Sequence, residues 1–167
     1  MEYLPPAPES ISAWLSGDAS KALLKRENHA VADSLSHAFG YNLLHVGIGE
    51  NSVSQCPIEH HILLKSSFQN AQMRGGLCAQ AEYLPFIQNS LDAVVLQHAL
   101  DFTQSPHKVL REASRVLMPK GDLIVTGFNP WSLWGLRRLI PLQGKNVPWM
   151  ANFISIGRIK DWLTLLD

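Results

Sequence analysis

Three things are scarce in this sequence: cysteine, an excess of charge of one sign, and long apolar runs. Cys56 and Cys78 are too few for a disulfide framework and lack the paired spacing of a zinc site, so both are expected to be plain thiols. Fourteen Lys and Arg residues balance fourteen Asp and Glu residues, which leaves no whole-molecule field to attract nucleic acid or an anionic membrane. No uncharged apolar stretch approaches the roughly 18 residues that a membrane span needs.

The length and composition indicate one globular domain. Apolar residues make up 46% of the 167 residues and charged residues 17%, whereas a disordered chain carries more charge and less apolar surface. The first residues lack the basic start and apolar run of a signal peptide, so we expect a cytoplasmic protein. We predict one domain over residues 1–167, with an N-terminal extension (1–19), a core (20–129) and a cover with a final helix (130–167).

Five short apolar runs, each bounded by polar residues, Gly or Pro, predict buried strands. They span residues 42–46, 60–64, 77–79, 91–96 and 123–126. The clearest helix is predicted over 106–117, where Ser105 can cap the helix and Pro106 suits its first position. Apolar periodicity also predicts helices over 20–39, 129–139 and 155–166.

Strands that alternate with helices across short connections predict a mostly parallel sheet with helices on both faces. Right-handed crossovers restrict the topology further. We therefore predict an α/β, doubly wound, Rossmann-like fold whose five strands follow the order 3-2-1-4-5.

The turn after the first predicted strand reads His45-Val46-Gly47-Ile48-Gly49. Glycines at this spacing let the backbone pass close to a ligand at the carboxyl ends of the strands, where such sheets bind cofactors. A purely structural turn has the same composition, so this segment does not decide the function alone.

Three further segments follow this turn in order. They are Gln80-Ala81-Glu82-Tyr83-Leu84-Pro85-Phe86, Ser90-Leu91-Asp92-Ala93-Val94-Val95-Leu96-Gln97-His98 and Val109-Leu110-Arg111-Glu112-Ala113-Ser114-Arg115-Val116-Leu117-Met118-Pro119-Lys120-Gly121. The ordered set resembles the type 11 family of S-adenosylmethionine-dependent class I methyltransferases, over about residues 43–129. That family has a glycine-rich loop after strand one, an acidic Ala-Glu-x-Leu-Pro-Phe segment after strand three, and a Glu-x-x-Arg-Val-Leu helix before strand five.

The resemblance implies methyl transfer from S-adenosylmethionine to a small or medium acceptor, with S-adenosylhomocysteine as product. The cofactor-binding residues implied by the match are His45, Gly47, Gly49, Gln80, Ala81, Glu82, Gln97 and His98. The glycines would lie beside the methionine part, residues 81–82 near the adenine edge, and residues 97–98 beside the methyl group and the substrate. The match assigns no catalytic residue and no metal.

The sequence departs from the family pattern within the cofactor motifs. His45 stands where the family has an acidic residue, Gln80 replaces an Asp, and Asn51 or Ser52 replaces a third glycine. These three changes alter the loop that would hold the cofactor.

A larger departure lies at the end of the second strand, where the family has a carboxylate that accepts hydrogen bonds from both ribose hydroxyls. This sequence has Leu64 and Lys65 there, so about 1.5–3 kcal/mol could be lost for each charged hydrogen bond. An alternative is therefore a non-catalytic relative that uses the crevice to bind a partner. A nicotinamide-dependent oxidoreductase is disfavoured, because the later motifs match methyltransferases.

Several other polar residues could have either a structural or a functional role. His98 could be a general base, although a lone His at a strand end is more often a polar rim residue. Glu112 and Arg115 are spaced to pair on a solvated helix face. The neighbouring His60 and His61 lack ligand companions and point to opposite faces of a strand, which argues against a metal site.

Tryptophan and arginine gather after the fifth predicted strand. These residues are Trp131, Trp134, Arg137, Arg138 and Trp149. An amphipathic helix covering the crevice is the favoured interpretation, with a membrane-surface or partner contact as the alternative. Because the family fold continues past a helix ending near Leu166, we expect its last strands to be missing and the fifth strand to have an open edge suited to self-association.

Overall fold

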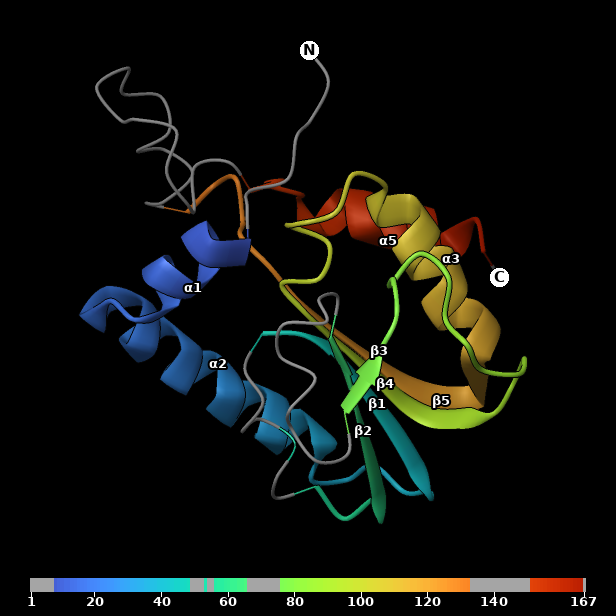
Figure 1. The fold of residues 1–167 in the computed structure, drawn as a ribbon. Coiled ribbons are helices and arrows are strands. Elements are labelled where there is room, and N and C mark those ends of the chain that lie inside the picture. The colour runs from blue at the N-terminus through green and yellow to red at the C-terminus, as the bar shows by residue number, and fades with distance from the viewer. Residues whose placement is uncertain (1–7, 49–52, 54–55, 66–75, 133–150, 167) are drawn as a thin grey trace.

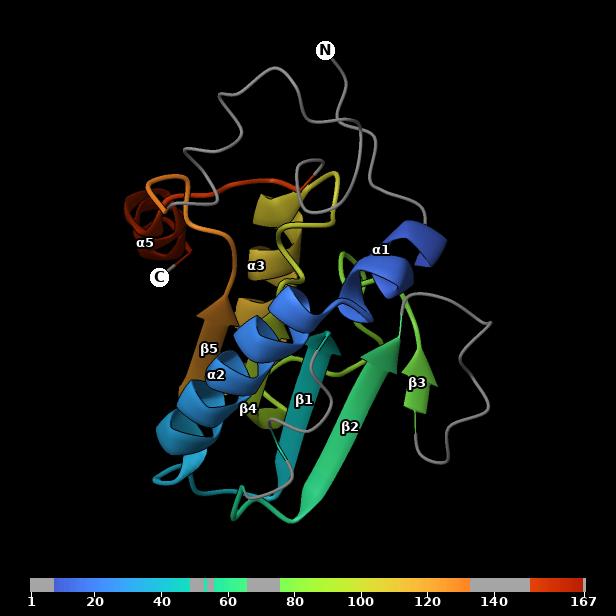
Figure 2. The same cartoon turned by 90° about the vertical axis from the view of Figure 1, so that its left-hand side faces the viewer.

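The computed structural model describes residues 8–48, 53, 56–65, 76–132 and 151–166. Five parallel strands form one sheet in the order β3-β2-β1-β4-β5, which confirms the predicted fold class and strand order. The strands are β1 (Asn42–Gly47), β2 (His60–Lys65), β3 (Gly76–Cys78), β4 (Leu91–Gln97) and β5 (Leu117–Thr126). Because the strands are parallel, their carboxyl ends meet at one edge of the sheet (Figure 2).

β5 begins six residues before the predicted strand at 123–126. Leu117 already pairs with Leu91 of β4, and the register shifts between Leu91 and Ala93 before regular pairing resumes at Asp122. The sequence pattern gave no strand signal over 117–122, because this part contains Pro119 and exposed polar residues. Backbone pairing with β4 nevertheless makes it part of the strand.

Helices cover both faces of the sheet (Figure 1). They are α1 (Pro8–Leu15), α2 (Asp18–Leu35), α3 (Pro106–Val116) and α5 (Ile156–Thr164). α1 and α2 lie on one face, and α3 and α5 lie on the other (Figures 1 and 2). α1 was not predicted, since it lies in the segment taken as an extension. None of the described helices is long and apolar enough to cross a membrane.

The helix boundaries depend on local hydrogen bonds. α2 ends at Leu35 instead of residue 39, because the N–H groups of Ser36 and Ala38 bond three residues back, in a tighter turn than an α-helix. Ser105 is the N-cap residue of α3, as predicted, but its side chain makes no capping hydrogen bond. The predicted position of the cap is therefore correct, and the predicted side-chain bond is wrong. Ser155 does cap α5, accepting from the Arg158 N–H at 3.4 Å.

Two apolar clusters hold the helices on the sheet. Alternation along the strands directs Leu44, Val94 and Leu96 towards α3 and α5, and Leu43, Ala93 and Val95 towards α2. In α2, Val31 and Leu35 fill the second cluster, so its C-terminal half packs by apolar contact. The middle of α2 meets the carboxyl edge of the sheet through the polar side chains of Glu27 and Asn28, described below.

Glu112 and Arg115 of α3 do pair, but not as a solvated surface pair. The Arg115 guanidinium donates to the carbonyls of Leu84 (3.0 Å) and Phe86 (2.9 Å), while the Glu112 carboxylate accepts from the Leu84 N–H at 3.0 Å. The bonds from Arg115 hold the pKa of Glu112 below its ordinary value. The pair therefore fastens the 84–86 segment, which follows the predicted adenine loop, to α3.

We expect Arg115→Ala to lower the free energy of unfolding by about 1–3 kcal/mol. The two backbone carbonyls of Leu84 and Phe86 and the Glu112 carboxylate would each lose a charged donor. Urea unfolding measures the change. Arg111→Ala removes an exposed Arg from the same helix and is the matched control. Equal stability of the two variants would show that the hydrogen bonds of Arg115 to the 84–86 segment do not contribute to the free energy of unfolding.

Candidate functional site

The glycine turn lies directly against the end of β4. Gly47 has φ +112°, and a Cβ there would lie 1.9 Å from the backbone oxygen of Gln97. The Ile48 N–H donates to the same oxygen at 3.0 Å. A glycine is required because the turn closes on the neighbouring strand. The second glycine of the motif, Gly49, lies outside the described residues.

Two predicted site residues, His45 and Gln97, bond to each other in the interior. His45 is 2% exposed, and its Nε2 donates to Gln97 Oε1 at 3.2 Å. The Gln97 amide in turn donates to Asn28 Oδ1 of α2 at 2.9 Å. A hydrogen-bonded network of His45, Gln97 and Asn28 thus occupies the place where the family has an acidic residue, and it ties β1 and β4 to α2.

His98 is a buried, doubly bonded imidazolium and not a rim residue, so the rim interpretation was wrong. Its side chain is 0% exposed, and its ring donates from Nδ1 to Asp101 at 2.7 Å and from Nε2 to Glu27 at 2.8 Å. Burial alone would lower the pKa of His98, but the two carboxylates raise it to about 9. Because both ring nitrogens carry protons at neutral pH, His98 cannot accept a proton as a general base there.

Asp101 connects this imidazolium to the exit of β5. Its Oδ2 also accepts from the Phe128 N–H at 2.9 Å, and a Cβ at Gly127 would lie 2.9 Å from its Oδ1. The pKa of Asp101 is raised above its ordinary value, chiefly because the carboxyl is buried, although the donors from His98 and Phe128 act in the opposite direction. These two donors on Oδ2 favour the charged carboxylate.

The segment predicted to lie near adenine is held by the loop after β4. The Tyr83 N–H bonds to the Gln80 carbonyl at 3.0 Å, which closes a turn around Ala81. The Glu82 carboxylate accepts a hydrogen bond from the Thr103 hydroxyl. The Thr103 oxygen also accepts from the Ser105 N–H at 3.1 Å. This places Glu82 on the same side of the sheet edge as the residues that follow β4.

Of the predicted site residues, His45, Gly47, Gln97 and His98 come together at the carboxyl ends of β1 and β4. The motif match did not find Glu27 and Asp101. Asp101 had a weak signal, a carboxylate three residues after His98, but Glu27 lies 71 residues away on α2. A single sequence carries no signal for such a pairing.

The end of β2 supplies no carboxylate. Leu64 is 3% exposed and belongs to the apolar cluster shared with α3, so it does not line a ribose site. The backbone of Lys65 pairs with Cys78 of β3, and the position of its side chain lies outside what the structure describes. Of the two positions that the resemblance offered for the family carboxylate, Leu64 and Lys65, Lys65 therefore remains.

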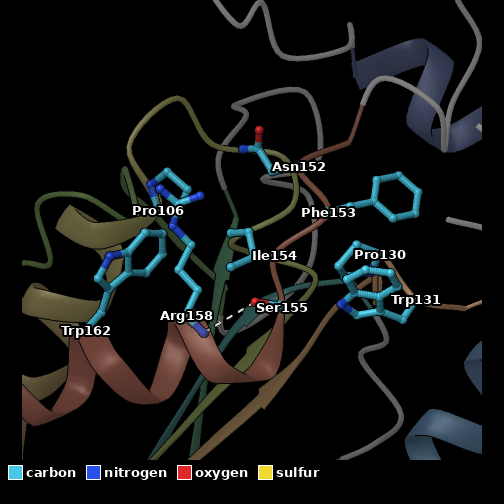
Figure 3. Close-up of a pocket in the computed structure, with 9 residues that line it drawn as sticks. All are labelled: Pro106, Pro130, Trp131, Asn152, Phe153, Ile154, Ser155, Arg158 and Trp162. Atoms are coloured by element: carbon cyan, nitrogen blue, oxygen red, sulfur yellow. Dashed lines mark hydrogen bonds between the residues drawn. The ribbon is translucent and has the colours of Figure 1, made fainter.

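A pocket of about 530 Å³ lies between the exit of β5, the start of α3 and α5 (Figure 3). Trp131 stands on one side, and Trp162 stands on the other with the Arg158 guanidinium 5.5 Å from its ring centroid. From the predicted tryptophan and arginine cluster, only Trp131 is described. It is 83% exposed, and the predicted helix over 129–139 lies mostly outside the described residues.

The strand order, the glycine turn at β1 and the polar residues after β4 together define a Rossmann-like class I methyltransferase fold. Residues 18–125 match the methyltransferase domain family, and the chain belongs to that family.

The chain is also similar in sequence to two known proteins. The uncharacterized protein YafS of Escherichia coli K12 is 35% identical over 131 residues, covering 77% of this chain and 53% of YafS. The biotin biosynthesis bifunctional protein BioHC of Saccharophagus degradans is 30% identical over 105 residues, covering 60% of this chain and 19% of BioHC. The chain thus spans about half the length of YafS and a smaller part of BioHC.

Solved structures show the same fold. A SAM-dependent methyltransferase from Thermotoga maritima aligns with a TM-score of 0.68 and 22% identity, covering 95% of this chain and 76% of that one. A SAM-dependent methyltransferase from Archaeoglobus fulgidus aligns with a TM-score of 0.66 and 15% identity, covering 86% and 68%.

Proposed function

We propose that this chain carries the cofactor-binding core of an S-adenosylmethionine-dependent methyltransferase that acts on a small-molecule acceptor. The observation that supports this most is the turn at Gly47, which closes on the end of β4 next to His98. Family membership over residues 18–125 gives the reaction class. The cofactor supplies an activated methyl group on a sulfonium, so the protein mainly has to align donor and acceptor.

The residues present fit the cofactor in part. The Thr126 hydroxyl at the carboxyl end of β5 is buried, with no hydrogen-bond partner among the described residues, and such a group suits a polar ligand at this edge. Gly47 brings the turn close to β4, and the 80–82 turn is held in place by Thr103. The ribose side lacks its acceptor, since Leu64 belongs to the core.

In this proposal the buried polar side chains position the crevice and transfer no proton. Glu27 and Asn28 of α2 hold His98 and Gln97, so α2 and the end of β4 form one preset wall. His98 keeps its proton at neutral pH. An acceptor that must lose a proton would therefore transfer it to solvent and not to this imidazole.

We expect the natural chain to bind S-adenosylhomocysteine weakly and Lys65→Asp to bind it about ten to a hundred times more tightly. The new carboxylate could accept the ribose hydroxyl hydrogen bonds, and each 1.4 kcal/mol is a factor of ten in affinity. Isothermal calorimetry measures both dissociation constants. Lys160→Asp, on the exposed side of α5, makes the same charge change away from the crevice and should leave affinity unchanged.

A second candidate is a non-catalytic relative that has kept the fold. It is favoured by His45, which stands in place of an acidic residue and bonds to Gln97, and by the missing strand-two carboxylate. If neither the natural chain nor Lys65→Asp binds at millimolar ligand, this candidate replaces the enzyme. Self-association through the outer edge of β5 likewise remains a proposal, which light scattering of the purified chain would test.

A further inference from the structure

We propose that the pocket between β5, α3 and α5 is the acceptor subsite and that it selects a planar aromatic acid. This inference rests on the proposed methyltransferase function and names the acceptor class for it. The volume of about 530 Å³ is within the range of small-molecule sites. The described residues that carry the argument are Trp131, Asn152, Phe153, Arg158 and Trp162.

The pocket adjoins the residues that follow β4. The Asn152 N–H donates to the Asp101 carbonyl at 2.7 Å, and its side-chain amide donates to the Thr103 carbonyl at 2.7 Å. Phe153 stacks on Phe128 with ring centroids 5.5 Å apart, and Phe128 lies 4.5 Å from His98. The pocket lining is therefore connected to the His98 cluster, beside which the methyl group is expected, through the rings of Phe153 and Phe128.

The walls suit a flat apolar body. Trp131 and Trp162 contribute two aromatic rings, and Pro106, Pro130 and Ile154 add further apolar surface. Figure 3 shows Trp131 and Trp162 on opposite sides of the pocket. Aromatic rings favour offset or edge contacts with another ring, so an aromatic ligand gains more here than an aliphatic one of equal size.

Arg158 supplies the charge. Its guanidinium lies over the Trp162 ring, a cation–π contact that restrains a long side chain. No ion pair between Arg158 and a carboxylate is found within the described residues. A guanidinium in this position matches a carboxylate in geometry and charge, and it repels a cationic amine. The pocket thus combines an aromatic slot with one anion-binding group.

The test uses 4-hydroxybenzoate, its neutral amide 4-hydroxybenzamide and the cation 4-hydroxybenzylamine as probes of the full chain. Dissociation constants come from the NMR shifts of the Trp131 and Trp162 indole N–H signals. We expect the acid to bind at least tenfold more tightly than the amide, and the amine to bind most weakly. In Arg158→Ala the advantage of the acid should disappear.

Lys160→Ala, which removes an exposed cation from the same helix, is the matched control and should keep the preference for the acid. Equal affinity for acid and amide, no shift of either indole, or loss of the preference in Lys160→Ala would overturn the inference. Calorimetry with S-adenosylhomocysteine on the same sample separates the two proposals. Cofactor binding without acid preference overturns this inference alone, and acid preference without cofactor binding would leave an anion site with no role in methyl transfer.

Discussion

Gly47→Ala is expected to lower the free energy of unfolding by at least about 3 kcal/mol and to abolish S-adenosylhomocysteine binding. The added Cβ would lie 1.9 Å from the Gln97 carbonyl oxygen and 2.9 Å from its carbon, so the clash is with the backbone of a central strand. The φ of +112° adds strain for any residue with a Cβ. Overpacking a close contact typically costs about 1–3 kcal/mol, and unfavourable backbone geometry adds a similar amount.

Urea unfolding and calorimetry measure the two effects. Gly157→Ala is the matched control, because no atom lies within 4 Å of a Cβ at that position in α5. This control should be neutral or gain about 0.5–1 kcal/mol from the better helix propensity of Ala. If Gly47→Ala has the same free energy of unfolding and the same affinity for S-adenosylhomocysteine as Gly157→Ala, the close approach of the turn to β4 is contradicted.

Asp101→Asn is expected to lower the free energy of unfolding at pH 7 by about 3 kcal/mol, because it breaks a buried charge pair and leaves the His98 imidazolium with Glu27 alone. The amide oxygen of Asn can still accept from His98 and Phe128, but it is uncharged, so both hydrogen bonds become weaker. Urea unfolding measures the loss. Asp161→Asn, on the exposed side of α5, makes the same chemical change and should cost almost nothing.

The same pair predicts a pH dependence. The pKa of His98 is raised from 6.5 to about 9 in the folded protein, so its contribution is fully present below pH 6.5 and is lost as the pH rises towards and through 9. The stability of the natural chain should therefore fall across this range, and Asp101→Asn should show a smaller fall. A flat profile in the natural chain, or an equally steep one in Asp101→Asn, would contradict the charged assignment of His98.

The fold could be predicted from the sequence because each strand has its own apolar run and the crossover between β4 and β5 has a clear helical period. The predicted boundaries of some elements were wrong for local reasons. The start of β5 is held by pairing with β4 at Leu117, which apolar periodicity does not register. α2 ends in a tighter turn at Ser36, and α1 lies in a segment with no recognised motif.

The positions of candidate site residues were predictable only where a residue lies at the end of a predicted strand. Gly47 and His98 could be placed at the same sheet edge because parallel strands bring their carboxyl ends together. The state of His98 was not found, because it depends on Glu27, which approaches from α2 after folding. The role of Arg115 was missed for the same reason, since its acceptors are backbone carbonyls about 30 residues earlier in the chain.

The most direct test of the cofactor site is an NMR titration of the ¹⁵N-labelled chain with S-adenosylhomocysteine. We expect saturable shifts at the amides of Ile48, Glu82 and His98, which lie at the carboxyl ends of β1, β3 and β4, with smaller shifts at Val31 and Leu35 of α2. Shifts confined to other surfaces, or no shifts at millimolar ligand, would contradict the claim that this sheet edge binds the cofactor.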